Sequence, residues 1–141
     1  MKKPSSADVD AARRLVAYEG GSGGSAEACA AAVGQVYEKL QLQFAPLVGL
    51  AGFHSLLARG AKLMQDEFPC LKESAAVESP TKLRECLRAQ EPDAIVATAA
   101  ALFGAFLSLL KTFIGERLTS EVLRMAWPAI GESAFKEEAK K

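Results

Sequence analysis

The side chains best suited to chemistry in this 141-residue chain are one histidine and three cysteines. His54 could act as a general base only with a partner in hydrogen-bond reach, and the positions one helical turn away are leucine and alanine. Cys29, Cys70 and Cys86 are 41 and 16 residues apart and include no Cys-x-x-Cys pair. A zinc site would have to recruit His54 and all three thiols from four separate elements. We therefore expect no metal site.

A cysteine nucleophile would need a lowered pKa, which nearby positive charge can provide. Cys29 and Cys86 fall on apolar helix faces, where thiols behave as small hydrophobic side chains. Cys70 follows a Phe-Pro pair and is expected to be the most exposed thiol, but Lys72 is the one cation near it in sequence. We expect no catalytic residues and no cofactor, and interpret the protein as a non-enzyme.

A polar group interrupts the apolar C-terminal third of the chain at Glu116, Thr119 and Arg124. Glu116 could accept hydrogen bonds from free backbone N–H groups around Thr119 while Arg117 or Arg124 pairs with it. The same residues could instead cap a corner between two helices, which is the interpretation that we favour. The sequence thus predicts a buried polar corner that orients Trp127 onto the core.

Aromatic and methionine side chains could line a pocket for a small apolar ligand. The candidates are Phe53, Met64, Phe103, Phe106, Phe113 and Trp127. At helical spacing, such side chains are more often ordinary core. A ligand pocket or interface at these residues remains an open alternative.

The charges argue against nucleic acid and anionic membranes as partners. The chain has 17 basic and 17 acidic residues, so no net charge attracts it to a polyanion. Lys82, Arg84 and Arg88 cluster in sequence, but Glu85 and Glu91 lie among them, which is typical of a solvated helix face.

The composition indicates that helices position these side chains. The chain has 26 Ala and 17 Leu but only 8 Val and 3 Ile, and Ala and Leu favour helices whereas β-branched residues favour strands. It contains no Asn, so the Asn-Gly hairpin signal is absent. We predict an all-α, single-domain helical bundle of five or six helices around a long apolar central helix.

A run of glycine and serine at residues 20–25 divides the chain. We predict a first helix plus flexible joint over residues 1–24, a bundle core over 25–130 and a charged tail over 131–141. Because glycine loses the most conformational freedom on ordering, the first helix could dock on its own domain or on a neighbour. Ser25 and Ser79 are expected N-caps, and Pro46 should end or kink its helix.

Residues 94–110 form an uncharged stretch that fits a buried central helix or a single membrane span. Seventeen residues lie at the lower edge of a spanning length, and Thr98 and Ser108 dilute the hydrophobicity. We favour the central helix and keep the single span as the minor alternative. The first residues lack the apolar run of a signal peptide, so we expect a cytoplasmic protein.

The chain resembles known proteins in two stretches. The first is LVGLAGFHSLLARG with the following EFP, and the second is TFIGERLTSEVLRMAWP. In both, the chain resembles a group of small, uncharacterised bacterial proteins with a Phe-Ile-Gly-Glu, Leu-Thr and Trp-Pro motif. The matching positions are Gly52, Phe53, Leu56, Leu57, Ala58, Arg59, Glu67, Phe68, Pro69, Phe113, Ile114, Gly115, Glu116, Leu118, Thr119, Leu123, Arg124, Trp127 and Pro128. The resemblance implies an all-helical bacterial domain and carries no activity.

Small residues gather in two of the predicted helices and allow close helix pairing, inside one bundle or across a two-fold dimer. They are Ala30, Ala31, Ala32, Gly34, Ala97, Ala99, Ala100, Ala101, Gly104 and Ala105. We predict a non-catalytic protein-interaction or self-association module, a homodimer or the partner of another protein. A small apolar-ligand-binding helical protein is the alternative.

Overall fold

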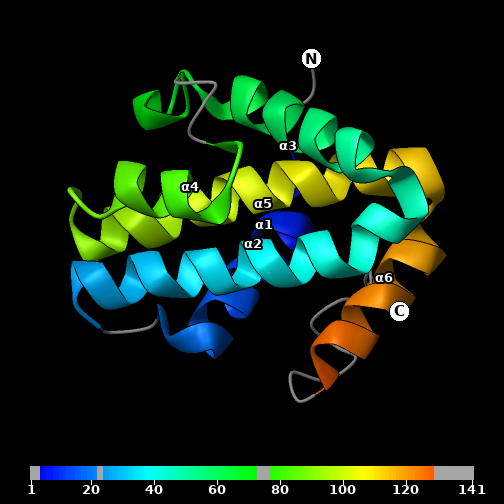
Figure 1. Ribbon diagram of the computed structural model, residues 1–141, viewed down its shortest axis with the longest axis horizontal. Coiled ribbons are helices and arrows are strands. Elements are labelled where there is room, and N and C mark those ends of the chain that lie inside the picture. The colour runs from blue at the N-terminus through cyan, green and yellow to red at the C-terminus, as the bar shows by residue number, and fades with distance from the viewer. Residues whose placement is uncertain (1–3, 22–23, 73–76, 129–141) are drawn as a thin grey trace.

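The uncharged stretch forms the middle of a 23-residue helix in the computed structural model, which describes residues 4–21, 24–72 and 77–128. These residues contain α1 (Ser6–Val16), α2 (Ala26–Val48), α3 (Leu50–Met64), α4 (Pro80–Leu87), α5 (Pro92–Ile114) and α6 (Glu116–Ala126). Two short helical turns, η1 (Ala17–Gly21) and η2 (Pro69–Lys72), complete the described elements. The predicted all-α bundle around a long apolar helix is confirmed (Figure 1).

Helix α5 is the centre of the bundle, in contact with α1, α2, α3 and α6. It is the one described helix long and apolar enough to cross a membrane, and 67% of its most apolar window is buried in the fold. A helix that is apolar all round must be covered on every side, and here the other helices cover it. Figure 1 shows α5 running the length of the bundle beside α2 and α3.

Helix α1 packs directly on α5, although the sequence allowed it to be loosely tethered. Gly104 makes this close approach possible, because a Cβ atom there would lie 2.9 Å from the Cα atom of Val9. The apolar face of α1 is buried through Ala11, Ala12, Leu15 and Val16. The first helix therefore belongs to the core. Residues 22–23 of the joint and the tail from residue 131 lie outside the described residues.

A buried ion pair fixes α1 on α5. Asp8 is only 5% exposed, and Lys111 Nζ donates to its Oδ1 at 2.6 Å. The Ser108 hydroxyl donates to the other carboxylate oxygen. The helix cap is a different residue, Ser5, whose hydroxyl accepts from the Asp8 backbone N–H at 3.1 Å. Asp8 therefore has its own role, which is to join the two helices by charge.

Most helix starts follow the predicted signals. Ser25 and Ser79 cap α2 and α4, each accepting a backbone N–H at 3.1 Å. Pro46 does not end its helix, since α2 continues through it to Val48. Proline removes one backbone donor, and this loss is tolerated because the helix ends two residues later. Thr119 was wrongly predicted as a cap, because α6 begins at Glu116.

Replacing Asp8 by Asn should lower the free energy of unfolding by about 2 kcal/mol, because the neutral amide loses the charged hydrogen bond that the buried carboxylate makes with Lys111. Urea unfolding measures this effect. Asp10→Asn, an exposed change on the same helix, is the matched control and should have little effect. Equal midpoints for the two variants would contradict a stabilising role for the Asp8–Lys111 pair.

Tyr37 should make the fold sensitive to alkaline pH. Burial, and then the charge of Glu78, raise the pKa of Tyr37 from 10.0 to about 12, and its hydroxyl donates to the Val77 carbonyl at 2.7 Å. A raised pKa means that the fold disfavours the phenolate, so this stability is complete below pH 10 and is lost as the pH rises to about 12. Ultraviolet titration of Tyr18→Phe isolates Tyr37. A midpoint near 10 in the folded protein would contradict the prediction.

Candidate interaction surface

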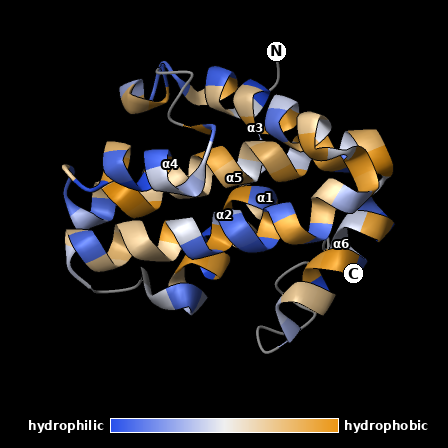
Figure 2. Ribbon diagram, in the orientation of Figure 1, coloured by the Kyte–Doolittle hydropathy of each residue, from blue (hydrophilic) through white to orange (hydrophobic). Residues whose placement is uncertain are grey.

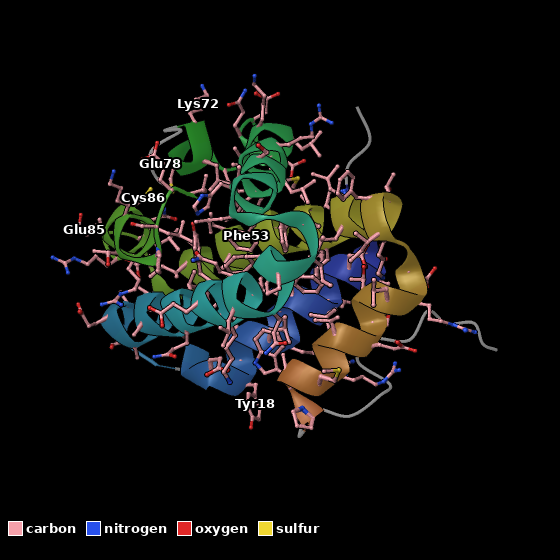
Figure 3. All side chains as sticks on the ribbon, turned by 45° about the vertical axis from the view of Figure 1, so that its right-hand side comes forward. Tyr18, Phe53, Lys72, Glu78, Glu85 and Cys86 are labelled. Carbon is pink, nitrogen blue, oxygen red and sulfur yellow. The ribbon has the colours of Figure 1, made fainter. Side chains whose placement is uncertain are left out.

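Two helix corners, each made by a single glycine, lie at the same end of the bundle (Figures 1 and 3). Gly49 separates α2 from α3 and Gly115 separates α5 from α6, with φ angles of 85° and 99°. Each glycine N–H donates to the carbonyl four residues earlier, at 2.7 and 2.9 Å. Each glycine carbonyl accepts from the N–H four residues later, at 2.8 and 3.2 Å. One residue thus ends one helix and begins the next, in a backbone conformation that is essentially restricted to glycine.

Large apolar side chains are exposed around both corners. Leu47 and Phe113 each precede their glycine by two residues and are 47% and 67% exposed. Leu50 directly follows Gly49 and is 52% exposed, and Leu118, in the first turn of α6, is 39% exposed. We call these four side chains the apolar end, and Figure 2 shows hydrophobic colouring where α5 reaches it. Single exposed apolar residues are ordinary, but a group of them on one face marks an interaction site.

The α5–α6 corner also carries charge. Glu116 and Arg117 are both exposed beside the apolar end. The predicted buried polar corner was therefore wrong for Glu116, and Arg124 is half-buried. Thr119 is fully buried, and its hydroxyl donates to the Gly115 carbonyl at 2.8 Å. The glycine conformation closes the corner through backbone bonds, so no carboxylate acceptor is needed inside it.

The predicted aromatic pocket is divided between the core and the surface. Phe53, Phe103 and Phe106 are fully buried, and Met64 is 5% exposed. The rings of Phe53 and Phe106 meet edge to face with centroids 5.2 Å apart, an ordinary core arrangement. Phe113 was wrongly grouped with them, because the helix turns it outward at the end of α5. It contributes to the apolar end instead.

Trp127 is 1% exposed and belongs to the core, as predicted, and its ring nitrogen reaches a polar cluster where η1, α2 and the end of α6 meet. Its ring nitrogen donates to Glu19 Oε2 at 2.8 Å, and Lys39 Nζ donates to the same oxygen at 2.6 Å. The Lys39 ammonium also lies 5.5 Å from the centroid of the Trp127 ring. Nothing in the spacing of these residues predicted the cluster, because they come from three elements far apart in the sequence.

Most of the small residues of α2 and α5 are used inside the bundle, which is the first of the two arrangements that the sequence allowed. In α5, Ala99, Ala100, Ala101, Gly104 and Ala105 are all buried. In α2, a Cβ atom at Gly34 would lie 2.4 Å from Arg84 Cδ, so α4 occupies that surface. Ala31 faces solvent, but its buried neighbours Ala30 and Ala32 do not. The apolar end is therefore a better candidate for an interface than the alanine faces.

The three cysteines differ in their surroundings. Cys29 is buried, whereas Cys70 and Cys86 are half-buried. Burial and then the neighbouring Cys86 raise the pKa of Cys70 to about 12, opposite to what a reactive nucleophile needs. His54 is half-buried, as expected of a boundary residue. Within residues 4–21, 24–72 and 77–128, no three His, Cys, Asp or Glu side chains gather closely enough to hold a metal ion.

Comparison with known proteins supplies no relative. No family model matches the sequence, and neither a curated protein nor a solved structure matches it. The function must therefore be inferred from the surface of this chain alone.

Substituting Gly115 by Ala should lower the free energy of unfolding by about 2 kcal/mol, because a φ of 99° strains any residue with a Cβ atom. Chemical denaturation measures the change. Gly52→Ala is the matched control, since Gly52 lies inside α3 and a Cβ there meets Val48 at an ordinary 3.5 Å. Alanine favours helix over glycine, so the control should be neutral or stabilising. If Gly52→Ala lowers the free energy of unfolding as much as Gly115→Ala, the backbone conformation of the corner does not explain the effect.

Proposed function

We propose that the protein is a non-catalytic self-association module whose copies meet through the apolar end. The observation that carries this proposal is the exposure of Leu47, Leu50, Phe113 and Leu118 around two corners at one end of the bundle. Burying such side chains against a second surface removes apolar area from water, which is the main favourable term in protein association.

The apolar end is held rigidly, which supports the proposal. Each corner is closed by backbone hydrogen bonds on both sides of its glycine. The Asp8–Lys111 ion pair anchors the last turns of α5 just before Gly115. A preorganised surface loses less conformational entropy on binding, so a modest apolar area contributes more affinity.

The charges favour a second copy as the partner. A two-fold interface brings the same patch of both copies together, so it must be complementary to itself. Glu116 and Arg117 are exposed neighbours of opposite charge, and across a two-fold axis each can face its opposite in the other copy. The chain has no net charge, so two copies do not repel each other at long range.

A small-ligand function is the second candidate, and one cavity favours it. The cavity has a volume of about 470 Å³, within the range of ligand pockets, and Ala58, Ala61, Leu71 and Val77 form its apolar lining. Arg59, Lys62 and Lys72 also line it, so it would suit an apolar molecule with an anionic group. This function needs no second copy, so a chain that stays monomeric at all concentrations favours it over self-association.

The double variant Leu47→Gln with Phe113→Gln should weaken self-association at least tenfold, because it removes two large apolar contacts at the interface. Light scattering across a concentration series gives the mass. The unmodified chain should rise from 14.9 kDa toward twice that value, while the variant should stay at 14.9 kDa.

Leu42→Gln with Met125→Gln is the matched control for this experiment. Leu42 and Met125 are 71% and 72% exposed but lie farther along their helices from the corners. The control should associate like the unmodified chain. The proposal fails if the unmodified chain is monomeric throughout, or if the control dissociates as readily as the variant at the apolar end.

A further inference from the structure

Two thiols from separate elements meet near the surface, at the other end of the bundle from the glycine corners. Cys70 lies in η2 and Cys86 in the last turn of α4, and their Sγ atoms are 2.6 Å apart. The Cys86 thiol also lies 3.5 Å from the backbone carbonyl of Cys70, to which it donates. Figure 3 shows Cys86 close to the turn that carries Lys72.

This arrangement differs from that of a cysteine used as core filling. Cys29 is 1% exposed, which is typical of a thiol packed as a small hydrophobic group. Cys70 and Cys86 are both half-buried. A cavity of about 340 Å³ borders Cys70 and is also lined by Gln90, Ala94 and Thr98. Cys70 therefore borders a space that a small molecule can enter, and Cys86 is half-buried in contact with it.

We propose that Cys70 and Cys86 are an oxidation site, which small-molecule disulfides such as oxidised glutathione convert reversibly to an intramolecular disulfide. A disulfide requires the two sulfur atoms to approach without rearrangement of the backbone. The fold already brings these two sulfur atoms into contact, although 15 residues separate them in the chain.

The reaction is two thiol–disulfide exchanges in sequence. The thiolate of Cys86 attacks one sulfur of the small disulfide, forming a mixed disulfide and releasing one small thiolate, which takes up the proton that Cys86 lost. The thiol of Cys70 then loses its proton and attacks Cys86 Sγ, which breaks the mixed disulfide and releases the second small thiol. The two protein thiols lose two electrons, and the small disulfide gains them.

The order of attack follows from the surroundings of Cys70. Burial, the hydrogen bond with Cys86 and the charge of Cys86 raise the pKa of Cys70 to about 12. We therefore assign the slower attack to Cys70, because a thiol with a raised pKa forms the thiolate nucleophile less readily. The first attack falls to Cys86, and Cys70 resolves the mixed disulfide.

The bond would join two parts of the bundle. Helix α4 packs on α2, whereas η2 packs on α3. A crosslink between η2 and α4 closes a loop in the unfolded chain and thereby reduces its conformational freedom. The oxidised protein should be the more stable form, with a midpoint of thermal unfolding higher by about 5 °C.

The experiment incubates the full chain with mixtures of reduced and oxidised glutathione, blocks the remaining thiols with an alkylating reagent and determines the mass and the linked peptides. The expected product has lost two hydrogens, carries one alkyl group on Cys29 and contains a peptide that joins Cys70 to Cys86. Excess reduced glutathione should restore three alkylated thiols.

Single variants separate the two steps. Cys70→Ser should stop at the mixed disulfide and retain glutathione on Cys86. Cys86→Ser should react with oxidised glutathione at least tenfold more slowly, because burial, the largest cause of the raised pKa of Cys70, still acts on the remaining thiol. Cys29→Ser is the matched control and should form the same bond as the unmodified chain.

The glutathione experiment on the unmodified chain can by itself overturn the proposal. A stable mixed disulfide on folded protein, a bond that involves Cys29, or three free thiols after equilibration with excess oxidised glutathione would each refute it. Self-association through the apolar end does not depend on this outcome, because neither cysteine belongs to that surface.

Discussion

The fold depends on one constraint, which is that α5 carries no charged side chain from Ala94 to Leu110 and must be covered on every side. Four helices satisfy this constraint, and the closest contact is with α1 at Gly104. Without a Cβ atom at that position, the backbones of α1 and α5 can approach until the Asp8 carboxylate meets Lys111. The apolar contact and the buried ion pair therefore act together to place α1.

The same constraint explains which apolar side chains remain exposed to solvent. The sides of α5 and the alanine-rich face of α2 are used within the chain, so they are not available to a partner. At the glycine corners no described helix covers the chain, and side chains two residues before each glycine face solvent. An interaction surface at the corners is thus a consequence of how the central helix is covered, and its rigidity comes from the same backbone hydrogen bonds.

The two proposed sites lie at opposite ends of the bundle. The corners join α2 to α3 and α5 to α6, while the dithiol pair lies between η2 and α4 (Figure 1). Each has a different physical origin: apolar exposure in one case and the approach of two sulfur atoms in the other. Association and oxidation can therefore be studied separately, by changing residues that do not contact one another.

The sequence by itself determined the helices, because local propensity, serine caps and the period of apolar residues act within a few positions of the chain. It located the starts of α2 and α4 and identified the central helix. Contacts between distant residues were decided only by the tertiary structure. Glu19 meets Trp127 across 108 positions, and Asp8 meets Lys111 across 103.

The candidate sites show the same division. Composition identified Phe113 as a large apolar side chain, but whether it is core or surface depends on where α5 ends relative to its neighbours. The spacing of Cys70 and Cys86 matched no motif, because their proximity comes from how η2 and α4 are placed by the rest of the bundle. Helical periodicity shows which residues share a face, whereas only packing decides what covers that face.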